Sequence, residues 1–206
     1  GKYMLNDPVS MYLPEFENMK ITDAELDVKN ASKITTGSIT GESIEIEKKG
    51  FAKNPIRIKD LFTMSGGLDY ALDDEYIKNA LAKGKKSTRE LVYAMSEKVL
   101  GFEPGTRFRY SLCHDVIGAL IEVWSEKKLG EYMRENIFEP LNMKNTFFGV
   151  PKDKEKLDKM AVRYTYDKNR QPKRLPLKCV YNLSDEYESG GAGLTSCTED
   201  YALFLD

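Results

Sequence analysis

The pattern of apolar and polar positions along the chain predicts a series of short helices in its central part. Helical patterns cover residues 58–64, 73–82, 87–100 and 129–138. Ser87 opens the third segment, and Glu90 follows three residues later, which is the spacing of a capping box. We therefore expect four helices here, the third with Ser87 as its N-cap.

A further amphipathic segment begins near residue 112. Its apolar positions predict one buried helix face, made of Cys113, Val116, Ile117, Leu120, Ile121 and Trp124. Pro104 and Gly105 predict a turn before an extended stretch over residues 108–110, and Ser111 is expected to cap the helix. Tyr110 is thereby placed at the mouth of this helix, where the backbone N–H groups and the helix dipole favour a negative charge such as a phenolate.

Strand signals are short and few. Residues 42–47 alternate polar and apolar positions, and a turn at residues 49–50 separates them from residues 55–58, which predicts a small hairpin or irregular excursion. Residues 161–166 alternate in the same way before a turn at 167–169. We therefore predict a fold that is mainly α with a few short β-strands.

Several local signals predict where elements start and stop. Asp7 is expected to be the N-cap of a short helix with Pro8 at its first position. Gly66 and Gly67 are interpreted as a helix stop, and Ser196 as the cap of a late helix.

Composition and charge limit the classes of partner. The chain has 206 residues with 41% hydrophobic content, which is enough to bury a core. Its 31 Lys and Arg residues nearly balance 33 Asp and Glu residues, so we expect no nucleic-acid partner and no anionic membrane partner. No apolar run approaches the length of a membrane span.

The three cysteines do not form a recognisable site. Cys113, Cys179 and Cys197 lack the paired short spacings of a zinc site or a disulfide framework. We predict reduced structural thiols, no metal and no cofactor. Reduced thiols favour a cytoplasmic protein, and the start at Gly1 leaves an extracytoplasmic location open.

Three stretches together resemble the serine β-lactamase and penicillin-binding-protein family, which includes class C β-lactamases and esterase-like serine hydrolases. The longest runs from Phe-Glu-Pro-Gly-Thr-Arg-Phe-Arg-Tyr-Ser at residues 102–111 to Pro-Leu-Asn-Met at 140–143. The others are Gly-Lys-Tyr-Met-Leu-Asn-Asp-Pro-Val at residues 1–9 and Ser-Gly-Gly-Ala-Gly-Leu at 189–194. The resemblance implies that the chain corresponds to the helical region of the α+β β-lactamase/transpeptidase-like fold.

The resemblance also implies roles for particular residues. Tyr110 would be the general base that takes the proton of a nucleophilic serine and later activates the deacylating water. Leu112 stands where the family commonly has an asparagine, and leucine cannot make that residue's hydrogen bonds. The candidates for substrate binding are Ser111, Leu112, His114, Gly190 and Gly191. Ser111 or His114 would replace the lost amide, and the glycines would let the backbone pass close to the active-site floor.

Two of the family's catalytic elements have no usable counterpart. The only Ser-x-x-Lys pattern, at residues 125–128, follows Tyr110 instead of preceding it, and no Lys-Thr-Gly occurs. We therefore expect residues 1–206 to be one partial domain from inside a longer protein and to be inactive alone. Within it we distinguish a variable excursion at 17–55, a helical core at 56–150, and loops and strands at 151–206 that lead to a missing sheet.

The implied parent enzyme would act on a small-molecule ester, amide or β-lactam-like substrate through an acyl-serine intermediate, as a β-lactamase, an esterase or a D-amino-acid peptidase. Self-association of the isolated chain is expected, because an apolar face would lack the sheet that covers it. Two other hypotheses stay open. One is a non-catalytic module that binds peptide or peptidoglycan on the same scaffold, and the other is an all-helical interaction domain.

Overall fold

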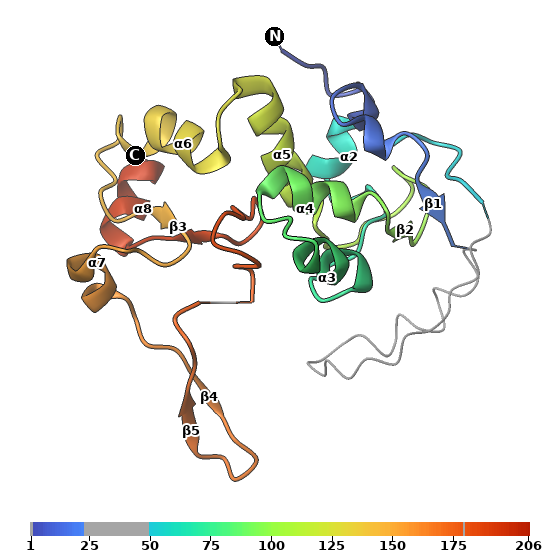
Figure 1. The fold of residues 1–206 in the computed structure, drawn as a ribbon. Coiled ribbons are helices and arrows are strands. Elements are labelled where there is room, and N and C mark those ends of the chain that lie inside the picture. Colours follow the sequence, from blue (N-terminus) through green and yellow to red (C-terminus); the bar gives the residue numbers. More distant parts are fainter. Residues whose placement is uncertain (1, 23–49, 179) are drawn as a thin grey trace.

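The structure is a computed structural model that describes residues 2–22, 50–178 and 180–206 (Figure 1). Helical residues outnumber strand residues in this part of the chain, and the strands form two-stranded sheets. The elements in chain order are η1 (Val9–Met11), η2 (Pro14–Phe16), β1 (Lys20–Ile21), α2 (Ile58–Phe62), α3 (Glu75–Ala82), α4 (Thr88–Met95), β2 (Val99–Leu100), α5 (Cys113–Ser125), α6 (Leu129–Met133), η3 (Arg134–Phe138), β3 (Phe147–Phe148), α7 (Lys154–Lys159), β4 (Tyr164–Tyr166), β5 (Pro172–Arg174), β6 (Leu194–Thr195) and α8 (Thr198–Leu205).

Helix α5 lies at the centre of the core. Helices α2, α4 and α6 pack against it, and α3 packs on α4 (Figure 1). The predicted apolar face of α5 is confirmed except for Ile121, which lines a groove instead of the core. Cys113, Val116 and Leu120 are fully buried, and Ile117 and Trp124 are partly buried against the same cluster. Burial of this face holds the surrounding helices together.

The capping box at the start of α4 is confirmed. The Ser87 hydroxyl accepts a hydrogen bond from the Glu90 N–H at 3.4 Å, and the Glu90 carboxylate accepts one from the Ser87 N–H at 3.1 Å. The predicted end of the helix at residue 100 is wrong, because α4 stops at Met95. Val99 and Leu100 instead form β2, which pairs in parallel with β1 and brings a segment distant in sequence onto the core.

Two of the predicted caps are wrong. Asp7 does not cap η1, because its carboxylate accepts hydrogen bonds from the Met4 N–H and the Tyr12 hydroxyl, each at 2.7 Å. Ser196 shares a hydrogen bond of 2.8 Å with the Thr146 hydroxyl, and α8 begins after Cys197 without a side-chain cap. In both cases a hydrogen bond outside the helix takes the side chain that the local pattern assigned to the helix end.

Gly66 and Gly67 do not act as a helix stop. Helix α2 already ends at Phe62, and Met64 adopts a positive φ of 54°. Gly67 has a φ of 85°, and a Cβ there would lie 2.6 Å from the Phe102 carbonyl oxygen. This glycine is therefore required by backbone conformation and by close packing against the segment that leads to α5.

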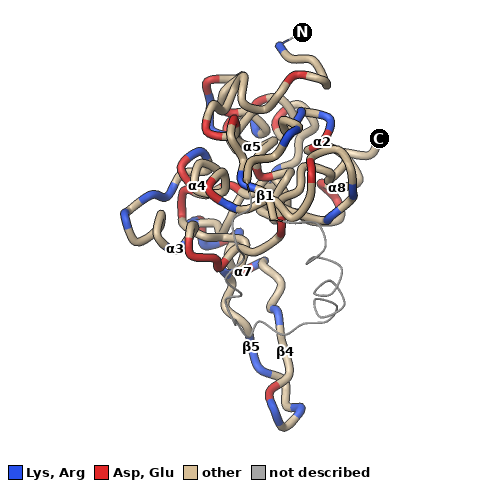
Figure 2. Tube along the Cα trace, turned by 90° about the vertical axis from the view of Figure 1, so that its right-hand side faces the viewer, with Lys and Arg blue, Asp and Glu red and all other residues tan. Residues whose placement is uncertain are grey.

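The strands form three separate two-stranded sheets among the described residues. Strands β3 and β6 are antiparallel, with Phe147 opposite Thr195. Strands β4 and β5 form a hairpin that projects from the body, as Figures 1 and 2 both show. The strand expected at 161–166 is thus present over its last three residues, whereas the one expected at 42–47 lies outside the described residues.

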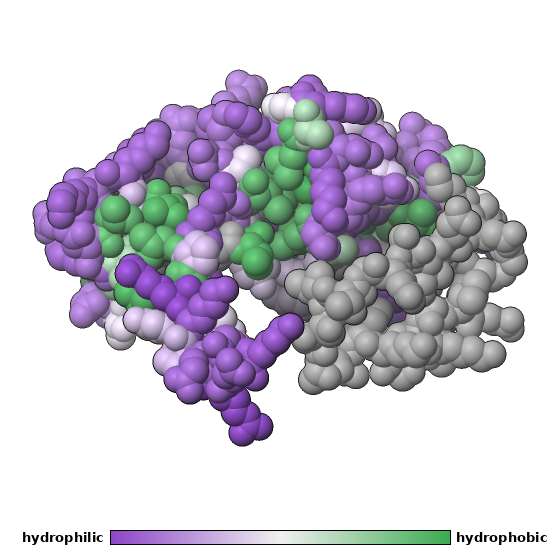
Figure 3. Space-filling view, turned by 60° about the horizontal axis from the view of Figure 1, so that its bottom comes forward, coloured by the Kyte–Doolittle hydropathy of each residue, from purple (hydrophilic) through white to green (hydrophobic). Residues whose placement is uncertain are grey.

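The surface carries both polar and apolar areas. Charged residues of both signs are spread over the chain (Figure 2), and apolar side chains emerge in two areas between polar ones on the face shown in Figure 3. Several large apolar side chains are exposed, among them Phe62, Leu194, Phe204 and Leu205. In the described part of the chain, no helix has the length and apolar character needed to cross a membrane.

The capping box makes a prediction about acid stability. Backbone hydrogen bonds from Lys86 and Ser87 lower the pKa of Glu90 from 4.5 to about 2. Its folded-state pKa lies below the unfolded value, so its contribution to stability is present above about pH 4.5 and is lost as the pH falls toward 2. Glu90→Gln should therefore lower the urea midpoint at pH 6 and have a smaller effect at pH 3.

Glu75→Gln is the matched control for this measurement. Glu75 also lies in the first turn of a helix, α3, where the cap is the Asp74 side chain. An equal loss of stability in the two variants at pH 6 would show that the charge of Glu90 gains nothing from its backbone hydrogen bonds beyond the effect of any charge near the helix dipole.

Candidate active site

Backbone hydrogen bonds on both sides of Tyr110 fix its position. The Arg109 N–H donates to the Met64 carbonyl at 2.9 Å, and the Leu112 N–H donates to the Asp69 carbonyl at 3.0 Å. The segment before α5 is thereby bound along the loop that follows α2. Tyr110 itself lies in irregular backbone three residues before α5, and its side chain is 60% exposed.

The exposed Tyr110 ring rests on a platform of other aromatic rings. It stacks on Tyr70 with ring centroids 5.1 Å apart, and Tyr70 in turn contacts the edge of Tyr181 at 6.0 Å. Burial and the neighbouring tyrosines and Asp115 raise the pKa of Tyr70 above its usual value, so this ring is a neutral platform at physiological pH. The stack limits the directions in which the Tyr110 hydroxyl can point.

A buried lysine holds the loop that carries Tyr70. Lys98 is 3% exposed, and its ammonium group donates to Asp69 Oδ1 at 2.8 Å and to the Ala71 carbonyl at 2.6 Å. It also forms an ion pair with Asp74, whose other oxygen caps α3 through the Ile77 N–H at 2.9 Å. Lys98 thus connects both ends of the 69–74 loop.

A buried carboxylate holds the glycine-rich segment against α5. Asp115 lies in the first turn of α5 and is fully buried. Its Oδ1 atom accepts hydrogen bonds from the hydroxyls of Tyr187 and Ser189, both at 2.6 Å. Burial, followed by the charge of Asp115, raises the pKa of Tyr187, which keeps this hydroxyl protonated as a donor. Among the described residues, Asp115 Oδ2 has no hydrogen-bond partner.

The close approach of this segment explains its glycines. A Cβ at Gly190 would lie 2.2 Å from the His114 carbonyl oxygen, and one at Gly191 would lie 3.1 Å from Asp115 Oδ2. Any other residue at position 190 would force the two segments apart. Gly190 and Gly191 therefore lie beside the start of α5, as close neighbours of His114.

The remaining candidate residues point in different directions. His114 is half-buried and lines an apolar groove of about 590 Å³ between α5, α6 and the glycine-rich segment. Ser111 is 2% exposed and its hydroxyl donates to Cys113 Sγ at 3.1 Å, so the prediction that it caps α5 is wrong. The N-cap position is occupied by Leu112, whose side chain is 1% exposed in the core.

Neither of the alternative nucleophiles is placed to react beside Tyr110, Ser125 because of its distance and Cys113 because of its burial. Ser125 is the last residue of α5, and a helix of 13 residues rises about 20 Å along its axis. Cys113 is fully buried, and burial raises the pKa of its thiol, so it is an inert structural cysteine. The described residues contain no group of three His, Cys, Asp or Glu side chains that could hold a metal ion.

Sequence reasoning located Tyr110 but missed Lys98 and Asp115. Both side chains act through contacts with residues between 24 and 74 positions away, which leave no signal in a local pattern. The only hint was Asp115 beside His114 at the start of a helix, where a carboxylate is common for reasons of the dipole alone.

Comparisons with known proteins show what the whole chain is similar to. The family model described as Beta-lactamase matches residues 1–206. The chain is 28% identical over 205 residues to the acyltransferase mokF of Monascus pilosus, covering 98% of this chain and 45% of that protein. It is 27% identical over 151 residues to a putative D-alanyl-D-alanine carboxypeptidase of Salmonella typhimurium, covering 72% of this chain and 28% of that protein.

Solved structures show the same fold. The structure of EstCE1, a hydrolase with promiscuous acyltransferase activity, matches with a TM-score of 0.68 and 24% identity, over 99% of this chain and 51% of that one. The octameric penicillin-binding protein homologue of Pyrococcus abyssi matches with a TM-score of 0.60 and 23% identity, over 100% of this chain and 39% of that one. The chain thus spans about half the length of these relatives, or less.

The Lys98 ion pairs make a testable prediction. Lys98→Met would leave Asp69 and Asp74 without their shared cation. The Lys98 side chain is only 4% exposed, but its partner Asp69 is 47% exposed and partly solvated. We therefore expect the free energy of unfolding to fall by about 2 kcal/mol, which is less than the loss for breaking a fully buried ion pair. Urea denaturation measures this loss. Lys78→Met, on the exposed side of α3, is the control and should change stability by less than about 0.5 kcal/mol.

Proposed function

The chain belongs to the beta-lactamase family, and we propose that it forms the helical wall of a serine hydrolase active site in which Tyr110 is the general base. The observation that carries this proposal is the placement of Tyr110. Its ring is exposed, stacked on Tyr70, and fixed by backbone hydrogen bonds on both sides at the N-terminal end of α5. A phenol held in this way can reach a substrate without reorganising the loop around it.

The proposed reaction proceeds in two proton-transfer steps. Tyr110 accepts the proton of the serine hydroxyl as the serine oxygen attacks the carbonyl carbon, and then gives that proton to the departing alcohol or amine. Tyr110 then accepts a proton from a water whose oxygen attacks the acyl carbon, and gives that proton to the departing serine oxygen, which restores the serine hydroxyl and releases the acid. An ordinary tyrosine has a pKa of about 10 and is a weak base at neutral pH. The proposal therefore needs positive charge beside the phenol, which the lysines of Ser-x-x-Lys and Lys-Thr-Gly elements would supply.

We propose that the catalytic serine and these lysines are supplied by chain outside the 206 residues. Within them, the one Ser-x-x-Lys pattern ends at Lys128, at the opposite end of α5 from Tyr110. Residues 1–206 would then be part of one domain and would show no turnover alone.

The apolar groove beside His114, lined also by Ile117, Ile121 and Phe148, is the surface that the rest of the domain would cover. Uncovered, it would promote self-association of the isolated chain.

The printed activities of the relatives support a proposal for the substrate class. The named relatives include an acyltransferase, a putative D-alanyl-D-alanine carboxypeptidase and a hydrolase with acyltransferase activity. All of these act on acyl groups, so we propose a small-molecule ester or amide, including β-lactam-like amides, as the substrate. The buried Leu112 side chain supports an ester over a classical β-lactam, because it offers no amide to bind the more polar substrate.

If Tyr110 is the general base, removal of its hydroxyl oxygen should greatly lower the rate of catalysis. Tyr110→Phe, in a protein that contains these residues and the family's serine element, should lower kcat for p-nitrophenyl butyrate by about 100-fold or more, because general-base catalysis contributes 10²–10⁴-fold. KM should change little. Tyr166→Phe, another exposed tyrosine in strand β4, is the control and should keep full activity.

The alternative is a non-catalytic module that binds peptide or peptidoglycan on the same scaffold. The observation in its favour is Leu112, whose buried apolar side chain offers no hydrogen bond at the position where the family commonly has an asparagine. A serine-directed fluorophosphonate probe separates the two. The hydrolase labels at one serine that precedes residue 1, whereas a binding module stays unlabelled. Undiminished turnover in Tyr110→Phe would exclude Tyr110 as the base.

A further inference from the structure

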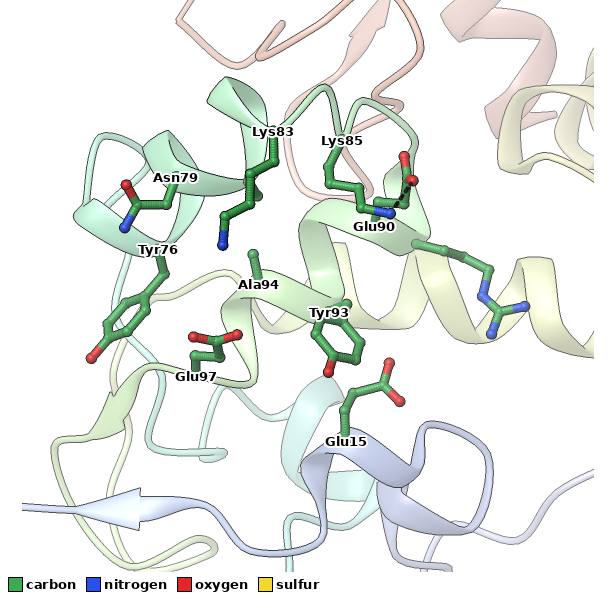
Figure 4. Close-up of a pocket in the computed structure, with 11 residues that line it drawn as sticks. Glu15, Tyr76, Asn79, Lys83, Lys85, Glu90, Tyr93, Ala94 and Glu97 are labelled. Atoms are coloured by element: carbon green, nitrogen blue, oxygen red, sulfur yellow. Dashed lines mark ion pairs between the residues drawn. The ribbon is translucent and has the colours of Figure 1, made fainter.

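A second groove lies on the outer side of the helical layer. It has a volume of about 760 Å³ and lies between α3, α4 and η2. The core face of α4 is formed by Leu91, Val92 and Met95, whereas a different face of the same helix lines this groove. Helix α4 therefore lies between the groove (Figure 4) and α5. The groove shares no lining residue with the one beside His114.

The groove carries equal numbers of opposite charges. Three cations and three carboxylates line it, namely Lys83, Lys85, Arg89, Glu15, Glu90 and Glu97. Of these, Lys85 and Glu90 form an ion pair at 3.2 Å. In the part of the chain that the structure describes, neither Lys83 nor Glu97 forms an ion pair or a side-chain hydrogen bond, whereas Arg89 interacts electrostatically with Glu122 on α5. The groove therefore presents unpaired positive and negative groups while its total charge is zero.

The unpaired charges lie on opposite walls. Figure 4 shows the Lys83 side chain extending from the end of α3 toward the space above Glu97, with Tyr76 on one side and Tyr93 on the other. Glu15 approaches from η2 near the Tyr93 ring. Lys83 and Glu97 thus face the same space without forming an ion pair.

We propose that this groove binds a short zwitterionic peptide. A ligand with one carboxylate and one ammonium group satisfies both walls at once, the carboxylate at Lys83 and the ammonium at Glu97. A simple anion would leave Glu97 without a partner, and a simple cation would leave Lys83 without one. A neutral saccharide would pair with neither charge. This inference does not depend on Tyr110 being a catalytic base.

The shape of the groove suits such a ligand. Its floor includes Ala80 and Ala94, whose small side chains leave room, and its volume lies in the range of about 300–1,000 Å³ typical of small-molecule sites. The rings of Tyr76 and Tyr93 offer apolar surface with a polar edge on either side. Because exposed ion pairs contribute little individually, we expect a dissociation constant on the order of 1 mM for a tripeptide.

Titration of the protein with trialanine, followed by two-dimensional NMR or calorimetry, tests the proposal. Acetylation of the amino end, or amidation of the carboxyl end, should each weaken binding about fivefold or more. Lys83→Met should weaken binding of trialanine but not of trialanine amide, which has no carboxylate for Lys83. Glu97→Gln should weaken binding of trialanine but not of acetyl-trialanine, which has no ammonium group for Glu97. This pairing of each residue with one end of the peptide is the specific expectation.

Lys78→Met is the matched control, because Lys78 is exposed on α3 but does not line the groove. It should leave the affinity for trialanine unchanged. Three results would overturn the proposal: no saturable binding of trialanine up to about 10 mM, equal binding of the doubly blocked peptide, or binding of maltotriose in preference to trialanine. Loss of affinity that is the same for every end-modified peptide would also overturn the assignment of Lys83 and Glu97 to opposite ends.

Discussion

The buried Asp115 carboxylate is the interaction on which the arrangement around Tyr110 depends. Taking a carboxylate out of water is costly, and here two short hydroxyl hydrogen bonds and the N-terminal turn of α5 offset that cost. The two hydroxyls belong to Tyr187 and Ser189, so the same contacts bring the glycine-rich segment onto α5. Gly190 is then a necessity, since the backbones approach too closely for any Cβ.

Lys98 plays the corresponding part on the other side of the aromatic platform. Its ammonium connects Asp69, Ala71 and Asp74, which positions Tyr70 beneath Tyr110. Asp115 thus fixes the glycine-rich segment near the Tyr70 hydroxyl, and Lys98 fixes the loop that carries Tyr70, each through hydrogen bonds of a buried charged group. Buried polar contacts of this kind add little net stability compared with apolar packing, but they allow only one geometry. That geometric restriction is what a catalytic or binding site requires.

The sequence pattern predicted the features that interactions between residues close in sequence determine. The capping box of Ser87 and Glu90 and the apolar face of α5 were predicted because spacing along a helix specifies both. The strand at Val99–Leu100 was not predicted, because its partner β1 lies far away along the chain. The failure of Ser111 to cap α5 was not predicted either, because its hydroxyl is buried against the sulfur atoms of Cys113 and Met64. Tyr110 was singled out by family resemblance, whereas Lys98 and Asp115 are recognisable only once the fold has brought their partners together.

The rate of acyl-enzyme formation tests the central role of Tyr110 most directly. Stopped-flow measurement of the p-nitrophenol burst, in a protein that contains this chain together with the family's serine element, isolates the first proton transfer from later steps. We expect the burst rate to fall about 100-fold or more in Tyr110→Phe. The amount of p-nitrophenol released in the burst should stay at one molecule per active site. A burst rate within twofold of the unaltered protein would contradict the general-base role of Tyr110.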